Sequence, residues 1–324
     1  MEYRSIQDLS RTIRDNLGRL PPDVALIAGV PRSGLLAATL LALHANLPVT
    51  DVDGLVAGRI LSHGQRLMER SVQHGRSRQG TVLILDDSIC SGAEMRRVKE
   101  TVAAASLARQ IAYGAVYGLP GQKHDVDVVL AECPQPRVFE WNIMHHSILK
   151  DSCMDIDGVL CRDPVEAEND DGARYCRFLQ EAEPYLLPTA EVGYLVTSRL
   201  EKYRGLTEGW LRRHGLRYRH LFMLDLPSKE ARVAQRAHVD FKSRMYRQTG
   251  ADLFIESSLW QATAIADRVA RPVFCVETFG MIYPAASARV VAVPRRLGGA
   301  VSRRVGRVAT RLGRMVRRQM RPGG

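Results

Sequence analysis

Two series of short apolar segments, each alternating with longer amphipathic stretches, run along most of this chain of 324 residues. In the first series, strands are predicted near 24–29, 48–52, 81–85, 110–117 and 126–130, with helices near 34–45 and 92–108. In the second, strands are predicted near 151–155, 192–196, 219–223, 252–256 and 272–276, with helices near 172–182, 199–214, 228–247 and 258–269. Because such alternation builds parallel sheets with helices on both faces, we expect two doubly wound α/β domains.

The length of the chain also suits two domains better than one. We predict a first domain over 1–148, a second over 149–285 and a tail over 286–324. The first boundary follows the Pro-bearing segment CPQPRVFEWNIMHH. The chain starts with a predicted amphipathic helix, in which Ser5 and Asp8 form a capping box and Leu9 and Ile13 lie on the apolar face with Ile6 and Leu17.

The net charge of +11 is confined to the C-terminal end. Residues 289–324 contain eleven Arg and no Asp or Glu, which leaves 35 basic and 35 acidic residues elsewhere. No run of about 18 apolar residues predicts a spanning helix, and the start lacks the apolar core of a secretory signal. The cysteines form no CxxC pair, so we expect a reducing, cytoplasmic location. They are Cys90, Cys133, Cys153, Cys161, Cys176 and Cys275.

The segment VLILDDSICSG, residues 82–92, is a buried strand that ends at two carboxylates before a helix begins. Asp86 and Asp87 offer acceptors for vicinal sugar hydroxyls or a hydrated Mg²⁺. Ser88, Ser91 and Gly92 lie at the predicted helix N-terminus, where amides and the helix dipole favour a phosphate. The segment fits a ribose 5-phosphate, although a plain turn with an ordinary helix cap would read similarly.

A second strand, ALIAGVPRSG (25–34), ends in a positively charged, glycine-bearing loop ahead of another helix. Together, the two segments resemble the type I phosphoribosyltransferases. The resemblance implies that the diphosphate of phosphoribosyl diphosphate binds at Val30, Pro31, Arg32, Ser33 and Gly34, with Mg²⁺ as cofactor. It implies that Asp86 and Asp87 face the ribose. The 5-phosphate would be held by Ser88, Ile89, Cys90, Ser91 and Gly92, where Cys-Ser-Gly replaces the family's Thr-Thr-Gly or a similar ending.

Residues 53–80 form a polar connection rich in arginine, which is either solvated surface or a lid over the diphosphate. We favour the lid, because this family has a mobile loop there and the charge would suit a diphosphate. The arginines are Arg59, Arg66, Arg70, Arg76 and Arg78.

In the second series, DSCMDIDGVL (151–160) ends a strand with carboxylates at Asp155 and Asp157, which suits a nucleophile and a proton donor. This DxDG opening resembles the haloacid dehalogenase superfamily of aspartyl-phosphate phosphatases, and the resemblance implies a second Rossmann-like fold. It implies phosphate binding by Thr197 and Ser198, charge neutralisation by Lys242 with Arg244 as a rival, and Mg²⁺ binding by Asp155, Asp157 and Glu256. Glu256 stands where the superfamily usually has one or two Asp, which puts metal affinity in doubt.

The spacing of these motifs leaves no room for a large cap domain. Only 40 residues separate Asp157 from Thr197, and 45 separate Thr197 from Lys242. Because the core strands and helices use up both gaps, we expect a capless, exposed phosphatase site.

In the tail, arginines at 304, 307, 311, 314 and 318 repeat with 3,4 spacing beside an apolar stripe. This pattern predicts a basic amphipathic helix on an anionic membrane surface at residues 289–324, and hence a peripheral location at the inner face of the membrane. Nucleic acid is a less favoured partner, and a disordered solubilising tail is the third reading.

These features favour transfer of 5-phosphoribose to an acceptor, followed by removal of the 5-phosphate. The arrangement is similar to the fused phosphoribosyltransferase–phosphatase proteins of bacterial surface-polysaccharide synthesis, which implies a glycan acceptor, possibly lipid-linked. The alternative is an orotate- or purine-type phosphoribosyltransferase fused to a nucleotidase. A non-enzymatic regulator that senses phosphoribosyl diphosphate is disfavoured by the paired carboxylates in both domains.

Overall fold

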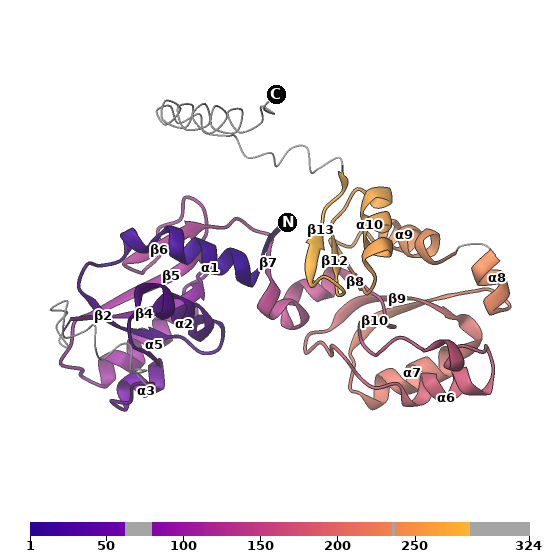
Figure 1. Cartoon of the computed structure of the whole chain (residues 1–324), viewed down its shortest axis with the longest axis horizontal. Helices are drawn as coiled ribbons and strands as arrows, with labels where there is room; N and C mark the ends of the chain where they lie inside the picture. Colours follow the sequence, from indigo (N-terminus) through magenta and orange to yellow (C-terminus); the bar gives the residue numbers. More distant parts are fainter. Residues whose placement is uncertain (62–79, 235–236, 286–324) are drawn as a thin grey trace, which may run out of the picture. The chain divides into compact units, whose positions relative to one another are not determined.

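The computed structural model describes residues 1–61, 80–234 and 237–285. They form a five-stranded parallel sheet and a six-stranded, mostly parallel sheet, both flanked by helices (Figure 1), and a small two-stranded sheet. The predicted α/β class with parallel sheets is confirmed. Most of the predicted lid, including Arg66, Arg70, Arg76 and Arg78, lies outside the described residues, as does the predicted tail helix.

The first sheet has five parallel strands in the order β3-β2-β4-β5-β6. They are β2 (Val24–Gly29), β3 (Val49–Asp51), β4 (Thr81–Ser88), β5 (Ile111–Gly118) and β6 (Val128–Glu132). The helices around it are α1 (Ile6–Asp15), α2 (Ser33–Ala45), α3 (Val52–Val56) and α5 (Ala93–Ala104).

Alternate side chains of β2 and β4 build a separate apolar core on each face of this sheet. Ile27 and Leu83 pack in one core with α1 and α2 residues such as Leu41. Leu26 and Ile84 pack in the other core, together with α5 residues. A doubly wound sheet has helices on both faces, so each strand buries apolar side chains on both of its faces.

The predicted capping box at the start of α1 is confirmed. The Ser5 hydroxyl accepts a hydrogen bond from the Asp8 amide at 3.1 Å, and the Ser5 amide donates to the Asp8 carboxylate at 3.0 Å. Leu9 and Ile13 are fully buried, so this helix closes one face of the first sheet.

The second sheet has six strands in the order β10-β9-β8-β11-β12-β13, of which only β13 is antiparallel. They are β8 (Ser152–Met154), β9 (Val192–Leu200), β10 (Tyr218–Leu224), β11 (Leu253–Glu256), β12 (Val273–Cys275) and β13 (Gly280–Ile282). Figure 1 shows α6 (Ala173–Glu181) and α7 (Arg204–Arg213) on one side of this sheet and α9 (Ala237–Thr249) and α10 (Leu259–Val269) on the other. A short helix, α8 (Lys229–Ala234), precedes α9.

A short N-terminal strand contributes to the apolar core of the second sheet. β1 (Glu2–Arg4) pairs in parallel with β7 (Arg137–Phe139). The Tyr3 hydroxyl donates to the Phe279 carbonyl at 2.9 Å, and Val138 belongs to the core of the second sheet. Sequence patterns missed both strands because three residues are too few to show a period.

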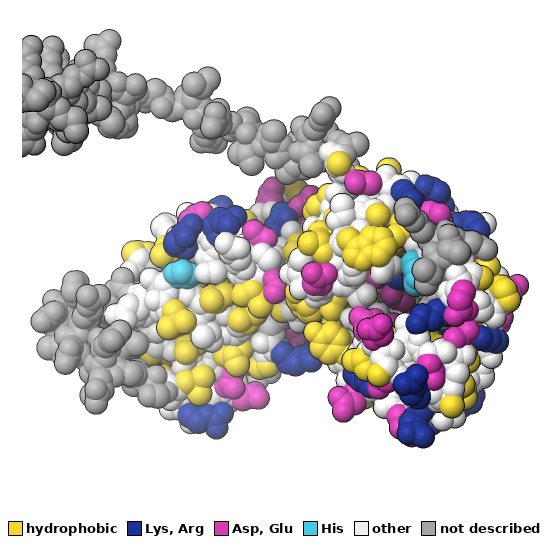
Figure 2. All heavy atoms as spheres, turned by 45° about the vertical axis from the view of Figure 1, so that its right-hand side comes forward, with side chains coloured by type: hydrophobic (Ala, Val, Ile, Leu, Met, Phe, Trp, Pro, Cys, Tyr) yellow, Lys and Arg dark blue, Asp and Glu magenta, His cyan; other side chains and the backbone are white. Residues whose placement is uncertain are grey.

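Residues Met1–Pro284 form one compact unit. The predicted boundary at 148 therefore stays a prediction, although the two sheets draw their strands from separate parts of the chain. On the face shown in Figure 2, Lys and Arg side chains alternate with Asp and Glu over the described residues, as the balance of charges outside the tail leads one to expect. Within the described residues, no helix is both long and apolar enough to span a bilayer.

Candidate active sites

The loops after β2 and β4 meet at the carboxyl edge of the first sheet, where ligands of such sheets bind. The Val30 amide donates to the Leu85 carbonyl at 3.0 Å. A Cβ atom on Gly34 would lie 2.8 Å from the Asp86 carboxylate and 2.9 Å from the Leu85 carbonyl. Only glycine therefore lets α2 begin against the acidic pair, which brings the predicted diphosphate and ribose segments together.

Asp87 is held in one orientation by two neutral donors. The Ser33 hydroxyl donates to its Oδ1 at 2.8 Å, and the Trp141 indole donates to its Oδ2 at 2.9 Å. Asp87 is only 4% exposed. Because each of its oxygens accepts one of these hydrogen bonds, the carboxyl group of Asp87 has a fixed orientation at the sheet edge.

Asp86 lies beside Asp87, and its carboxyl group accepts fewer hydrogen bonds. Its Oδ1 accepts from the Asp87 amide at 2.8 Å. Burial and the charge of Asp87 raise the pKa of Asp86 to about 8. Without a cation, Asp86 therefore tends to hold a proton. A hydrated Mg²⁺, a hard cation that prefers oxygen ligands, would fit the pair by taking the place of that proton.

The predicted 5-phosphate loop is anchored from beneath. Ile89 is buried, its amide donates to the Tyr117 carbonyl at 2.8 Å, and its carbonyl accepts from the buried Arg137 at 3.0 Å. Cys90 and Ser91 are exposed above it. Gly92 takes the N-cap position of α5 with φ +70°, a left-handed conformation that glycine adopts at little cost, and provides no side-chain cap. The first amides of α5 are thus placed to bind an anion.

Arg96 adds a cation to this loop. Its guanidinium donates to the Ser91 carbonyl at 3.0 Å and is exposed. Arg32, at the N-cap of α2, is also exposed, and the Pro31–Arg32 peptide bond is cis. Basic side chains thus stand beside both predicted phosphate-binding loops.

Sequence reasoning missed three residues at this site: Trp141, Arg137 and Arg96. Trp141 stacks on Phe139 with ring centroids 4.8 Å apart, and its indole donates a hydrogen bond to Asp87. Arg96 could have been found from its place in the first turn after the acidic segment. No sequence signal marks Arg137, because its partners are backbone carbonyls distant in sequence.

In the second sheet, Asp155, Lys242 and Glu256 meet where β8, α9 and β11 converge. The Lys242 ammonium donates to Asp155 at 2.5 Å and to Glu256 at 2.8 Å. Burial alone would lower the pKa of Lys242, but the two carboxylates outweigh it and raise that pKa. Burial raises the pKa of Asp155 to about 8, against the opposing charge of Lys242. The rival Arg244 is exposed and lies over the Phe241 ring instead.

Asp157 forms an ion pair with Arg199, a buried arginine for which the sequence predicted no role. The Arg199 guanidinium donates to Asp157 Oδ1 at 2.6 Å and to Oδ2 at 3.1 Å. The Arg199 side chain is fully buried. Thr197 is buried, and its hydroxyl accepts from the Arg199 amide at 3.2 Å; Ser198 is 8% exposed.

As arranged, the predicted metal ligands do not fit Mg²⁺. The oxygens of Asp155 accept from Lys242 and the Ile156 amide, and those of Glu256 accept from Lys242 and Ser257. Arg199 takes both oxygens of Asp157. Within the described part of the chain, no group of three or more acidic, His or Cys side chains is arranged to hold a metal ion.

The expectation of an exposed phosphatase site is wrong for this structure. Asp155 is 5% exposed, and Thr197, Lys242 and Glu256 are at most 1% exposed. The capless arrangement that the motif spacing suggests stays a prediction, and in this structure the side chains of Lys242 and Arg199 extend into the carboxylates and close the site. Exposure depends on these long side chains, which motif spacing does not describe.

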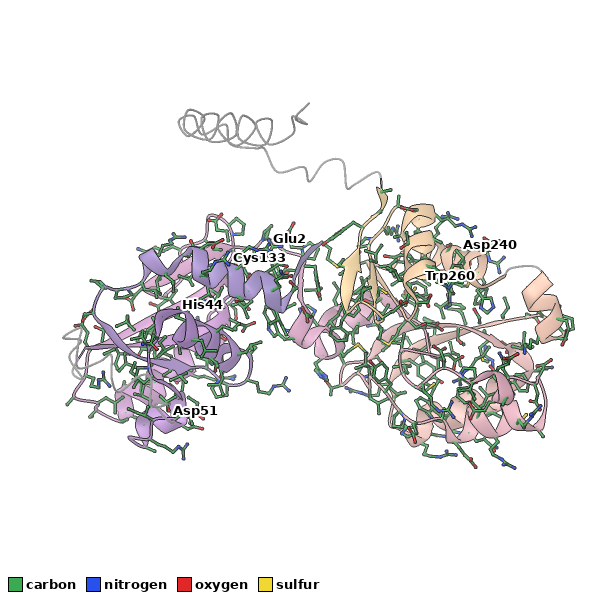
Figure 3. All side chains as sticks on the ribbon, in the orientation of Figure 1. Glu2, His44, Asp51, Cys133, Asp240 and Trp260 are labelled. Carbon is green, nitrogen blue, oxygen red and sulfur yellow. The ribbon has the colours of Figure 1, made fainter. Side chains whose placement is uncertain are left out.

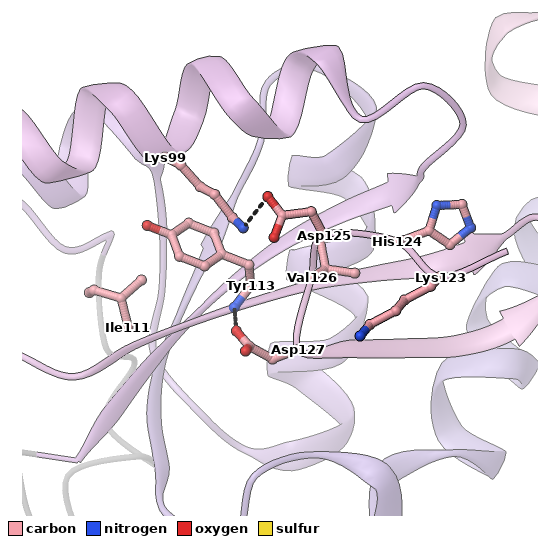
Figure 4. Close-up of a pocket in the computed structure, with 8 residues that line it drawn as sticks. All are labelled: Lys99, Ile111, Tyr113, Lys123, His124, Asp125, Val126 and Asp127. Atoms are coloured by element: carbon pink, nitrogen blue, oxygen red, sulfur yellow. Dashed lines mark hydrogen bonds and ion pairs between the residues drawn. The ribbon is translucent and has the colours of Figure 1, made fainter.

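A separate depression of about 540 Å³ lies beside the amino ends of β5 and β6 (Figure 4). Its Lys99 pairs with Asp125 at 2.8 Å, and the Asp127 carboxylate accepts from the Tyr113 amide at 2.7 Å. The acidic pair lies at the carboxyl end of β4, so this depression is no part of the site described above.

No protein-family model and no curated protein matches the chain. Among solved structures, it is similar to a xanthine-guanine-hypoxanthine phosphoribosyltransferase of Helicobacter pylori (16% identity, TM-score 0.30, covering 44% of this chain and 92% of the other). It is also similar to a purine phosphoribosyltransferase of Pyrococcus horikoshii (20% identity, TM-score 0.30, 43% and 92%). A chain of a Pnkp1/Rnl/Hen1 complex covers 78% of this chain and 95% of its own length, with 17% identity and a TM-score of 0.27. At such identities and TM-scores, the likeness assigns neither a family nor a substrate to this chain.

Proposed function

We propose that this protein transfers a 5-phosphoribosyl group from phosphoribosyl diphosphate to an acceptor hydroxyl and then hydrolyses the 5-phosphate of the product. The observation that carries the first step is the fixed carboxylate of Asp87. Ser33 of the predicted diphosphate loop and Trp141 hold it directly beside Asp86. This acidic pair lies at the edge of the sheet where a basic loop leads into α2 and a glycine N-cap, which has no side chain of its own to cap the helix, leads into α5.

In the first step, the bond between C1 of the ribose and the diphosphate oxygen breaks. Positive charge develops on the ribose ring, and the fixed charge of Asp87 stabilises it. Negative charge develops on the leaving diphosphate, which Arg32 and the amides after Val30 stabilise. Mg²⁺, when bound, would neutralise part of that charge. The oxygen of the acceptor hydroxyl attacks C1 from the face opposite the diphosphate and loses its proton. This attack inverts the anomeric centre and gives a β-ribosyl product.

In the second step, Asp155 attacks the phosphorus of the 5-phosphate and forms an aspartyl phosphate, while the bond from phosphorus to the sugar oxygen breaks and that oxygen takes a proton to leave as the alcohol. Water then attacks the aspartyl phosphate, and inorganic phosphate and free Asp155 result. Lys242 already contacts Asp155 and would neutralise the charge on the transferred phosphoryl group. The Lys242 ammonium and the Arg199 guanidinium close this site by binding the carboxylates. An entering phosphate ester therefore has to compete with Asp155 and Asp157 for these two cations.

We propose a glycan as the acceptor, possibly lipid-linked. A nucleotide made by the first site would be a substrate for the second site of the same chain, so a salvage enzyme of this design would destroy its product. A ribosylated glycan instead requires this dephosphorylation, and the fused phosphatase meets its substrate at a high effective concentration. We further propose that residues 289–324 bind an anionic membrane surface, where such glycans are assembled.

The test supplies phosphoribosyl diphosphate and Mg²⁺ with a polyprenyl-linked glycan, orotate or a purine, and follows diphosphate and phosphate release. Asp87→Asn should stop diphosphate release, and Asp155→Asn should accumulate a phosphorylated ribosyl-glycan. The exposed Asp225→Asn is the matched control. Turnover with orotate or a purine and none with glycans would overturn the glycan proposal.

Liposome flotation tests the tail, with anionic and neutral vesicles. The full chain should float with anionic vesicles, and a chain that ends at residue 288 should not. Equal flotation of the two chains would reject the membrane proposal.

A further inference from the structure

Trp260 differs from the other two tryptophans of the chain in its surroundings. The indole of Trp141 donates to Asp87 and that of Trp210 to the Ala182 carbonyl, and both rings pack against another ring. Trp260 is 64% exposed, and within the described part of the chain its indole N–H has no hydrogen-bond partner and no ring packs against it. A large exposed aromatic surface with a free donor at its edge has the properties of a binding surface.

Trp260 lies in the first turn of α10, close in sequence to the second site (Figure 3). The next residue, Gln261, belongs to that site, because its side-chain carbonyl accepts from the Lys242 ammonium at 3.2 Å. Lys242 in turn donates to Asp155 and Glu256. Trp260 is therefore the neighbour of a residue that contacts the central cation of the site.

The geometry of helical side chains directs Trp260 toward the loop before α10. In an α-helix, side chains lean toward the N-terminus and cover the turn that precedes their own position. For Trp260, the residues three and four positions earlier are Ser257 and Glu256. A Cβ atom on Gly158 of the DxDG turn would lie 2.5 Å from the Ser257 Cβ, so this loop packs directly against the turn that carries Asp157. Trp260 thus lies at the rim of the closed site.

The backbone that carries Trp260 is held in place by hydrogen bonds. The Leu259 amide donates to the Glu277 carboxylate at 2.8 Å, and the Glu277 amide donates to the Ser257 carbonyl at 3.0 Å. The Ser257 hydroxyl donates to the Glu256 carboxylate at 3.1 Å. A tryptophan on such a fixed segment offers a large contact area, and little conformational entropy is lost when a ligand binds to it.

A sugar ring next to the phosphorylated ribose fits this surface. One face of a hexopyranose carries mainly C–H groups, which pack on an aromatic ring, and its hydroxyls accept from an indole N–H. Asp155, Lys242 and Glu256 are at most 5% exposed. Whatever extends beyond the phosphorylated ribose therefore has to stay outside this closed site, at the rim where Trp260 lies.

We propose that Trp260 binds the sugar to which the phosphoribosyl unit is attached, so that the phosphatase site selects ribosylated glycans over free ribose phosphates. This inference rests on the proposed second step and deepens it, since it names the part of the glycan that the second site recognises. Contacts with this remote sugar stabilise the bound substrate while its phosphate competes for Lys242 and Arg199. A ribose phosphate without the second sugar lacks these contacts.

The test uses two phosphate esters that share the same reacting end. One is methyl β-ribofuranoside 5-phosphate, and the other is the same 5-phosphoribosyl unit β-linked to methyl β-galactopyranoside. Phosphate release by the full chain in the presence of Mg²⁺ measures kcat/KM for each. Wild type should prefer the disaccharide, and Trp260→Ala should lower the ratio of the two kcat/KM values about 3- to 10-fold. Trp260→Phe keeps an aromatic face and should lower this ratio less.

Leu43→Ala, which removes another exposed apolar side chain, is the control and should keep the wild-type ratio. An unchanged ratio for Trp260→Ala, whether both values fall equally or neither falls, would overturn the proposal. A loss with inosine 5′-phosphate and none with the disaccharide would also overturn it, because Trp260 would then stack on a base. If wild type releases phosphate from neither ester faster than Asp155→Asn does, the proposed phosphatase step itself fails.

Discussion

A tryptophan in a segment that reads as core decides how one carboxylate of the acidic pair is oriented. Trp141→Phe keeps the stacking on Phe139 but removes the 2.9 Å hydrogen bond to Asp87. A hydrogen bond to a charged group contributes about 1.5–3 kcal/mol, so we expect kcat/KM for phosphoribosyl diphosphate to fall about 10- to 100-fold. Steady-state diphosphate release at varied donor concentration measures this.

The matched control is Trp210→Phe. This substitution also removes an indole hydrogen bond, to the Ala182 carbonyl at 2.8 Å, but in the second core. It should lower the melting temperature and leave kcat/KM for diphosphate release unchanged. Equal losses of kcat/KM in the two variants would mean that Trp141 acts only through general packing.

Asp86 gives the first site a pH dependence. Its pKa, raised to about 8 by burial and the charge of Asp87, lies above its unfolded value of 3.8. The folded state therefore holds a proton that the unfolded state loses, so this contribution to stability is fully present below pH 3.8 and is lost as pH rises through about 8. Asp86→Asn cannot ionise, and its melting temperature should rise relative to wild type between pH 5 and 9.

Calorimetry of the ligand-free proteins measures this difference. Asp225→Asn, an exposed control, should keep a constant offset from wild type over the same range. A constant offset for Asp86→Asn as well would show that Asp86 ionises normally.

At the scale of elements, α2 can approach β4 only because residue 34 has no side chain. Gly34→Ala would place Cβ 2.8 Å from the Asp86 carboxylate and 2.9 Å from the Leu85 carbonyl, and the latter is backbone that cannot turn away. The start of α2 must shift, and with it Ser33, the partner of Asp87. We expect loss of donor binding in isothermal titration calorimetry with phosphoribosyl diphosphate and Mg²⁺.

Gly205→Ala is the control, since it lies in α7 with no atom near the added Cβ. Alanine in place of a helical glycine should stabilise the chain by about 0.5–1 kcal/mol without changing donor binding. If Gly34→Ala binds the donor as wild type does, the close approach of α2 is not needed for the site.

Lys242 joins three elements, since α9 supplies the charge between the ends of β8 and β11. Lys242→Met leaves Asp155 and Glu256 buried without a cation, and breaking such a pair costs about 3–5 kcal/mol. Adding Glu256→Gln removes one of the two charges and should restore part of the loss. Urea unfolding measures both variants, and the exposed Arg244→Met on the same helix should cost far less. Additive losses in the double variant would contradict a shared charge cluster.

At the scale of the whole molecule, the first four residues help to complete the core of the second sheet. The Tyr3 ring packs against Phe274 with centroids 6.1 Å apart, and its hydroxyl bonds the Phe279 carbonyl. Tyr3→Ala should reduce the free energy of unfolding by about 2 kcal/mol, less than for a fully buried aromatic. Hydrogen exchange should quicken at residues 273–282 more than in the first sheet.

Arg11→Ala, on an exposed position of α1, is the control for the N-terminal segment. Uniform acceleration of exchange in both sheets would show that Tyr3 stabilises the chain as a whole and not the second core in particular.

The sequence by itself determined the strands, helices and parallel sheets, because each depends on local periodicity that a buried strand or an amphipathic helix must show. It also placed VPRSG and DDSICSG at the ends of two strands, and parallel strands end at one edge. The sequence did not predict the short strands β1 and β7, because three residues are too few to show a period.

Only the tertiary structure decided which partner each charged group takes. Trp141 and Arg137 reach the first site from a segment far along the chain, and Arg199 takes the carboxylate that the DxDG pattern suggests for proton transfer. The tertiary structure also decided that the second site is closed, because packing and charge determine where long side chains such as Lys242 and Arg199 lie. Residue types at a fixed spacing describe the backbone that carries a site, whereas hydrogen bonds between distant segments decide what each side chain in it is able to do.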